Sequence, residues 1–306
     1  MRVTQSMLSS NMLRNLNTSY GKMSKLQDQM TSGKKVNRPS DDPVVVVKGM
    51  NYRVEVDKVE QYQRNVSTAH TWLDTTDEAL DQVGTALHRV KELTVQAAND
   101  TNTPEEREKI AAEIAQIKEQ MRDISNTKVG DKYIFSGAHT NEPLYKANNA
   151  TPPVVEANAA VTATGGQRDF KLNVFDGISL NVNTSGKELF GQIDTFLADL
   201  SDLLENGGSG KEIGDKLGDG GTTELSGLTE MVLVKRADIG ARQNRLEMME
   251  NRLDIQFVNV TKQMSENEDT DYTEAITQMA TTESIHQASL SIGAKIVQQT
   301  LVDFIR

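Results

Sequence analysis

Residues 59–97, with the sequence VEQYQRNVSTAHTWLDTTDEALDQVGTALHRVKELTVQA, predict one long helix with a continuous buried edge. Two sets of residues recur at steps of seven and are offset by three, which is the a/d pattern of a coiled coil. The sets are Val59, Val66, Leu73, Leu80, Leu87 and Thr94, and Tyr62, Ala69, Thr76, Val83, Val90 and Ala97. With the residues before it, the helix is expected to cover about 45–98 and to be roughly 75 Å long, so it needs partners along its whole length.

Two later segments offer such partners. Thr103-Pro104-Glu105-Glu106 has a capping threonine, a proline at the first helical position and a glutamate at the third, which together predict a helix start. The apolar stripe after it, which should return antiparallel along the long helix, is Ile110, Ile114, Ile117, Met121 and Ile124. A further stripe at steps of seven, able to lie against the set that contains Val59, is Leu225, Val232, Ile239, Leu246, Leu253 and Val260.

The two chain ends carry the same kind of pattern. In a helix expected over about 4–32, the apolar edge has one polar member and consists of Leu8, Met12, Leu16, Ser19, Met23, Leu26 and Met30. The edge of the last segment is Leu290, Val297 and Phe304, widened by Ile292, Ile296 and Leu301. Residues 1–50 carry eight basic against three acidic residues, whereas 266–306 carry two against seven. Opposite charge and apolar edges predict that the terminal helices pair with each other and form an assembly interface.

The middle of the chain has a different character. From about residue 129, Gly, Asn, Thr and Pro accumulate, and short strands are expected at 133–135, 152–155, 170–175 and 178–182. A short helix should follow at about 189–200, and the glycine-rich stretch 207–221 is predicted to be a flexible loop. The acidic stretch 266–271 is predicted to be a solvated junction before the last helix.

Together these patterns predict a mainly α fold, an elongated and nested helical rod. Its N- and C-terminal helices should pair at one end, and a small β-rich insertion should lie at the other. Residues 1–44 with 266–306 are expected to form the terminal coiled-coil segment, and 45–130 with 222–265 the helical rod. Residues 131–221 are expected to form the outer insertion with its short helix and glycine-rich loop.

Composition and motifs argue against an enzyme. The chain has no cysteine, its net charge of −11 disfavours nucleic acid as a partner, and no stretch approaches the ~20 apolar residues of a membrane span. The run Gly207-Gly208-Ser209-Gly210-Lys211 is not a phosphate loop, because Glu205 and Glu212 stand where that motif needs a glycine and a hydroxyl. We therefore expect no catalytic residue, no metal and no cofactor.

The turn between the first two helices is unusually polar and constrained. It contains Arg38, Pro39, Ser40, Asp41, Asp42 and Pro43. The prolines fix the backbone, and Ser40 with the adjacent acids can bond local amides and cap the next helix. We expect this elbow motif to make specific contacts, including contacts between subunits.

The chain resembles the flagellin superfamily in several motifs. They are SGKKVNRPSDDP at 32–43, QYQRNVSTAHTWLDTTDEAL at 61–80, MRVTQSMLSSNMLRNL at 1–16, YIFSG at 133–137, GISLNVNTSGKELF at 177–190, RADIGARQNRLE at 236–247 and ASLSIGAKIVQQTLVDFIR at 288–306. The first motif is common to the superfamily, whereas the start, YIFSG and the last segment favour its hook–filament junction branch. A flagellin more typically closes with a Leu-Leu-Arg-like ending, where this chain has Asp303-Phe304-Ile305-Arg306.

The resemblance implies an extracellular structural adaptor that joins the bacterial flagellar hook to the filament. It implies a passage through the cytoplasm, export by the flagellar type III apparatus, and terminal segments that become ordered on assembly. The implied partners are the first hook-associated junction protein, flagellin, other copies in a ring, and an export chaperone on the C-terminal segment. A flagellin is the nearest alternative. An unrelated coiled-coil binding protein and a hydrolase built into 130–220 are more distant ones.

Overall fold

The computed structural model describes residues 5–99, 102–147, 155–162, 170–218 and 224–303. It divides into two compact units, one made of residues 1–59 and 255–306 and the other of residues 60–254. Two long helices, α2 (Pro43–Ala97) and α7 (Leu225–Glu268), contribute residues to both units. The fold is mainly α, as the sequence predicts.

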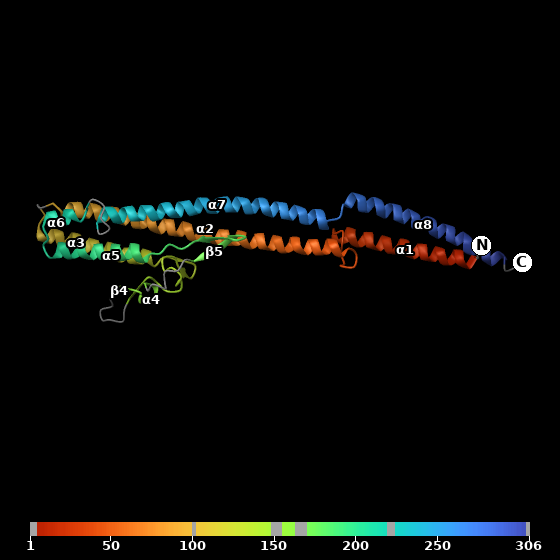
Figure 1. Ribbon diagram of the computed structural model, residues 1–306, viewed down its shortest axis with the longest axis horizontal. Coiled ribbons are helices and arrows are strands. Elements are labelled where there is room, and N and C mark those ends of the chain that lie inside the picture. Colours follow the sequence, from red (N-terminus) through yellow and green to blue (C-terminus); the bar gives the residue numbers. More distant parts are fainter. Residues whose placement is uncertain (1–4, 100–101, 148–154, 163–169, 219–223, 304–306) are drawn as a thin grey trace. The chain divides into compact units, whose positions relative to one another are not determined.

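The helices α1 (Gln5–Ser32) and α8 (Tyr272–Asp303) belong to the first unit, which we call the terminal unit (Figure 1). We call the second unit the central unit. Among its described residues are the helices α3 (Pro104–Ser125) and α5 (Lys187–Glu205) and the short helices α4 (Ala159–Thr162) and α6 (Gly210–Asp215). It also contains three antiparallel strand pairs, β1–β2 (Lys128–Val129 and Lys132–Tyr133), β3–β4 (Tyr145–Ala147 and Val155–Ala157) and β5–β6 (Lys171–Phe175 and Ile178–Asn181).

The seams predicted for α2 and α7 are confirmed. Every member of the set at steps of seven that begins at Val59 is buried, and so is every member of the α7 stripe that begins at Leu225. Of the second α2 set only Tyr62 is half-buried. The two buried threonines Thr76 and Thr94 remain satisfied, because each hydroxyl donates to the carbonyl oxygen four residues earlier at 2.7 Å.

Ion pairs and hydrogen bonds flank this apolar seam in the central unit, where α2 and α7 lie side by side (Figure 1). Arg236 on α7 donates to Asp77 at 2.9 Å and to Asp81 at 2.6 Å on α2. Seven residues further along α7, Gln243 donates to Asp74 of α2 at 2.8 Å. The pairs at the surface add little energy, but they are compatible with only one register of the two helices.

The helix α3 packs on the other helices of the central unit as its stripe predicts. All five stripe residues from Ile110 to Ile124 are buried, and Arg89 of α2 donates to Glu113 of α3 at 2.8 Å. The apolar stripe of α3 does not predict that this helix also packs along α5, where Arg122 donates to Asp194 at 2.8 Å. Tyr145 lies beside this pair, and burial, reinforced by the Asp194 charge, raises the pKa of its hydroxyl to about 12.

The start of α3 is the predicted capping box. Thr103 Oγ1 accepts from the Glu106 amide at 3.4 Å, and the Glu106 carboxylate accepts from the Thr103 amide at 3.0 Å. Two amides at the helix start, which have no partner inside the helix, are thereby satisfied.

We expect Thr103→Ala to lower the free energy of unfolding of the central unit by about 1 kcal/mol, because it removes this cap. Urea unfolding followed by far-UV circular dichroism measures the change. Thr68→Ala is the matched control, since the Thr68 hydroxyl only donates back to the Arg64 carbonyl within α2. Equal losses in the two variants would contradict a capping role.

The β-rich segment differs from its predicted layout in part. The strands β5 and β6 are confirmed, but of 133–135 only Tyr133 is in a strand, while Ile134 and Phe135 are buried in a turn. Phe135 stacks edge-on against Phe190 of α5 with ring centroids 4.9 Å apart. Residues 152–154 of the strand predicted at 152–155 lie outside the described residues, and β4 begins at Val155.

The β5–β6 hairpin packs on the helices of its own unit. Phe170 lies against Trp72 of α2 with centroids 5.7 Å apart, and the Arg252 guanidinium of α7 lies 4.1 Å from the Phe175 ring centre. Arg242 of α7 donates to the carbonyl oxygens of Asn181 and Asn183 at 3.2 and 3.1 Å. This hairpin is therefore part of the helical packing rather than a separate appendage.

The prediction of a flexible loop at 207–221 is wrong for its first half. Ser209 and Glu212 form a second capping box, and α6 follows it with Ile213 fully buried. Residues 219–221 lie outside the described residues. The helix was not predicted because the glycine-rich composition of this stretch is typical of a flexible linker. The cap that starts the helix depends on only two residues, Ser209 and Glu212.

Candidate assembly interface

The terminal helices α1 and α8 pack against each other in the terminal unit (Figure 1). The half-buried positions of α1 are Ser9, Met12, Leu16, Ser19, Met23, Leu26, Gln29 and Met30, and all but Gln29 recur at steps of three and four. The buried and half-buried positions of α8 follow the same spacing and are Ala275, Met279, Thr282, His286, Ser289 and Gly293. The pair is thus a two-helix seam with a heptad pattern on both sides.

The two sides of this seam differ in size and polarity. Large side chains come mainly from α1, whereas α8 contributes mostly small or polar ones. At one end Gly293 lies so close to Met12 that a Cβ atom at position 293 would overlap the methionine side chain. Near the centre, Tyr20 and His286 have ring centroids 6.2 Å apart. The seam buries little apolar area, so we expect the pair to be weak without further contacts.

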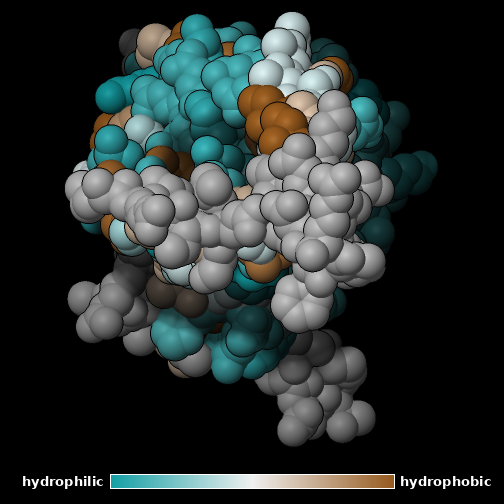
Figure 2. All heavy atoms as spheres, turned by 90° about the vertical axis from the view of Figure 1, so that its right-hand side faces the viewer, coloured by the Kyte–Doolittle hydropathy of each residue, from teal (hydrophilic) through white to brown (hydrophobic). Residues whose placement is uncertain are grey.

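Apolar side chains remain exposed on both helices. They are Met7, Leu13 and Tyr20 on α1, and Tyr272, Ile276, Ile285, Leu290 and Ile292 on α8. Figure 2 looks onto the end at the right of Figure 1 and shows brown apolar surface on a mostly hydrophilic face. Exposed apolar residues in this number on two paired helices indicate a surface that other chains cover.

The predicted interface residues have different positions. Met12, Leu16, Met23, Leu26 and Met30 lie in the α1–α8 seam, whereas Leu290 is 48% exposed and lies beside it. Leu8 is in α1, and Ile296, Val297 and Leu301 are in α8, but their side chains are outside the described part of the structure, as is Phe304 altogether. The role of these residues in assembly stays a prediction.

The segment between α1 and α2 ends the first helix and caps the second. Gly33 ends α1 with φ 71°, and its amide donates to the Gln29 carbonyl at 2.8 Å. Asp42 Oδ1 accepts from the amides of Val44 and Val45 at 3.0 and 3.1 Å, which is the predicted cap of α2.

The other members of the elbow motif lie at the surface. Asp41 Oδ2 accepts from the Arg38 amide at 3.3 Å, and Asp41 pairs with Lys25 of α1 at 3.3 Å. Arg38, Pro39, Ser40 and Pro43 are exposed in this single chain. They are therefore accessible for contacts with another subunit.

Sequence reasoning missed Glu268, which it placed in a solvated junction. Glu268 is only 8% exposed, and its Oε2 atom accepts hydrogen bonds from Lys34 at 2.9 Å and from Arg53 at 2.6 Å. Burial raises the pKa of Glu268, but the hydrogen bonds and charges of Arg53 and Lys34 lower it by more. The other three acids, Glu266, Asp269 and Asp271, are exposed as predicted, and Asp271 caps α8 through the amides of Thr273 and Glu274. No pattern in the sequence marks one acid of four as buried.

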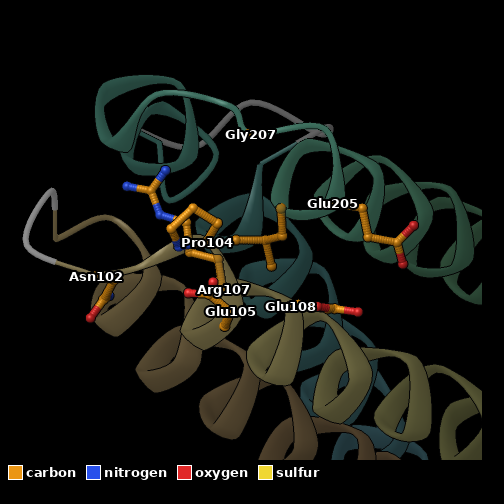
Figure 3. A pocket seen from close by; sticks show the side chains of 8 residues that line it. Asn102, Pro104, Glu105, Arg107, Glu108, Glu205 and Gly207 are labelled. Atoms are coloured by element: carbon orange, nitrogen blue, oxygen red, sulfur yellow. The ribbon is translucent and has the colours of Figure 1, made fainter.

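A hollow of about 790 Å³ lies between the start of α3 and the end of α5 (Figure 3). Its lining includes the carboxylates of Glu105, Glu108 and Glu205, and Arg107 donates across it to the Gly208 carbonyl at 2.8 Å. Among the described residues that line it there is no histidine and no hydroxyl nucleophile.

Over the described part of the chain, no group of three or more His, Cys, Asp or Glu residues could hold a metal ion. Over the same residues, no helix is long and apolar enough to cross a membrane.

Two family models match the chain. The bacterial flagellin N-terminal helical region matches residues 3–140, and the bacterial flagellin C-terminal helical region matches residues 225–305. Together they cover more than two thirds of the chain, including α1, α2, α3, α7 and α8.

Individual proteins are similar over nearly the whole length. The flagellar hook-associated protein 3 of Escherichia coli is 25% identical, with 94% of this chain and 95% of that protein covered. The flagellin of Bacillus subtilis is 26% identical, with 98% of this chain and 97% of that protein covered. Among solved structures, a putative flagellar hook-associated protein from Vibrio parahaemolyticus aligns with a TM-score of 0.60 at 22% identity, over 75% of this chain and 100% of that one.

Proposed function

Because the chain belongs to the bacterial flagellin family, we propose that it is a structural component of the flagellum that joins the hook to the filament. The similarity to hook-associated protein 3 extends over 94% of the chain, so it includes both the helices and the segment between them.

The observation that carries this proposal is the incomplete burial of the α1–α8 pair. The seam between the helices is half-buried and partly polar, while five apolar side chains of α8 and three of α1 remain exposed. A pair of this kind gains stability when neighbouring subunits cover its outer faces. The predicted interface residues Leu290, Ile296, Val297 and Leu301 belong to the helix that would be covered, and Phe304 follows it in the sequence.

The same proposal includes the route and the partners. The chain leaves the cytoplasm through the flagellar type III apparatus with an export chaperone on its C-terminal segment. It then assembles as a ring between the first hook-associated junction protein and flagellin. The lack of cysteine suits a chain that crosses a reducing and then an oxidising compartment, because no wrong disulfide can form.

The second candidate function is that of a flagellin, the filament subunit. The flagellin of Bacillus subtilis is as similar to this chain as hook-associated protein 3 is, so the identities do not separate the two functions. The exposed apolar faces of α1 and α8 suit a filament subunit equally well. The two functions differ in abundance and in position, which a deletion distinguishes.

Deletion of the coding sequence in the source strain tests both functions. For a junction adaptor we expect hooks without filaments and flagellin shed into the medium as monomer, detected by blotting. If the major filament protein disappears from the blot, the chain is a flagellin. Unchanged filaments would contradict both functions.

A further inference from the structure

The buried Glu268 is the centre of a joint that we call the clasp. It consists of the side chains of Lys34, Arg53 and Glu268, of Gly49, and of the backbone at 33–35 and 268–270, all in the terminal unit. Lys34 and Glu268 are 234 residues apart in the chain. The clasp therefore joins the end of α1 and the elbow to the turn between α7 and α8.

The clasp is shaped around the carboxylate of Glu268. Gly49 of α2 is buried against this side chain, and a Cβ atom at position 49 would overlap its Oε1 atom. Both cations bond Oε2, Lys34 from the elbow side and Arg53 from α2. Glu268 thus occupies the space that the missing Cβ of Gly49 leaves open, and it accepts charge-assisted hydrogen bonds from two different cations.

Backbone contacts continue the joint on either side of Glu268. The amide of Lys35 donates to the Glu268 carbonyl at 2.6 Å, and the amide of Thr270 donates to the Gly33 carbonyl at 2.9 Å. Lys34 and Asp269 are therefore paired as in an antiparallel ladder. Asn267 adds a hydrogen bond to the Val45 carbonyl of α2 at 3.0 Å.

The charges around the clasp keep it closed at neutral pH. The groups that face Glu268 are Lys34 and Arg53, and together they outweigh its burial, so the pKa of Glu268 lies below the ordinary value. Its contribution to stability is complete above the ordinary carboxylate range and is lost only when the pH falls through the lowered value. Of the adjacent acids, Asp269 accepts from Ser265 and Asp271 caps α8.

We propose that the clasp is the joint that makes the two chain ends pair, by holding the end of α1 beside the start of α8. The α1–α8 seam is half-buried and partly polar, so on its own it stabilises the helix pair only weakly. The two helices lie at opposite ends of the chain, and bringing them together costs conformational entropy. A closed clasp turns their pairing into a local event and raises the effective concentration of one helix at the other. The inference rests on the proposed function only for its role in assembly, not for the joint itself.

Hydrogen exchange of the purified full-length chain tests the joint directly. We expect Glu268→Ala to accelerate exchange by about tenfold in α1 and in the first turns of α8, since two charge-assisted hydrogen bonds are lost. Amides of the central unit should be unchanged. The matched control is Glu266→Ala, because Glu266 is exposed and only approaches Lys262 at 3.9 Å. Unchanged exchange in Glu268→Ala would overturn the proposal.

A disulfide provides a rescue that a merely unfolded variant would not show. Because the chain has no cysteine, Lys34→Cys with Asp269→Cys introduces a single possible bridge, at two residues that face each other across a ladder pair. The triple variant combines the two cysteines with Glu268→Ala, and the reference is the oxidised double-cysteine protein that keeps Glu268. We expect oxidation of the triple variant to slow hydrogen exchange in α1 and α8 to the rate of this reference. Reduction of the disulfide should make exchange fast again. Exchange that remains fast after the bridge has formed would contradict the clasp.

The same variants, expressed in the deletion strain, separate the joint from the proposed function. Loss of filament attachment by Glu268→Ala but not by Glu266→Ala supports a role of the clasp in assembly. If exchange is accelerated while filaments attach normally, the clasp has no role in assembly, although the proposed adaptor function is unaffected.

Discussion

Replacing Leu290 by aspartate should abolish filament attachment while the isolated protein remains folded. Leu290 is 48% exposed on α8, so in the single chain a charge at this position still reaches water. In the assembled ring that we propose, neighbouring subunits cover this face, and an unpaired carboxylate there would cost several kcal/mol per copy. Since every copy carries the substitution, we expect hooks without filaments and flagellin in the medium of the complemented deletion strain.

The control for this prediction keeps the side chain apolar. Leu290→Met conserves volume and hydrophobicity and should support normal filaments. Circular dichroism and urea unfolding of both purified variants should show an unchanged central unit, because residue 290 belongs to the terminal unit. Normal filaments with Leu290→Asp would contradict the burial of this face in the assembly.

Truncation of Leu80 to alanine should cause a large loss of stability in the central unit. The side chain is fully buried in the α2 seam, on the helix edge that faces α7. Its loss removes apolar contacts and leaves a cavity, for which we expect a decrease of about 2–5 kcal/mol in the free energy of unfolding. Urea denaturation with tryptophan fluorescence measures it, since Trp72 is the only tryptophan and lies in the same seam region.

Leu233→Ala is the matched control for the seam. Leu233 has the same side chain on α7 in the same unit but is 60% exposed. Its truncation should change the free energy of unfolding by no more than about 0.5 kcal/mol. A similar loss in both variants would contradict the burial of the predicted edge.

The helices could be predicted because their signals repeat. The edges of α2 and α7 recur at steps of seven over many turns, so a single misread residue does not change the result. The caps at Thr103 and Asp42 are local and could be read from neighbouring residues. Both kinds of information lie within a few residues or in a simple period.

The rest depends on residues that are distant in sequence. Arg236 meets Asp77, Arg122 meets Asp194, and Glu268 meets Lys34 only once the helices have packed in one register. The α8 edge that packs on α1 could not be predicted from apolar periodicity, because it is made of small and polar residues such as Gly293 and Ser289. Small residues at this edge let the two helices approach closely, and this role can be recognised only when the partner helix is known.

The unequal sizes of the residues in the α1–α8 seam make the two chain ends non-interchangeable. Two copies of α1 would crowd methionine against methionine, and two copies of α8 would leave unfilled space at Gly293 and Ala275. We therefore expect each end to pair with its opposite rather than with its duplicate. A subunit truncated at one end should be completed by the helix that it lost and not by a spare copy of the end that it retains.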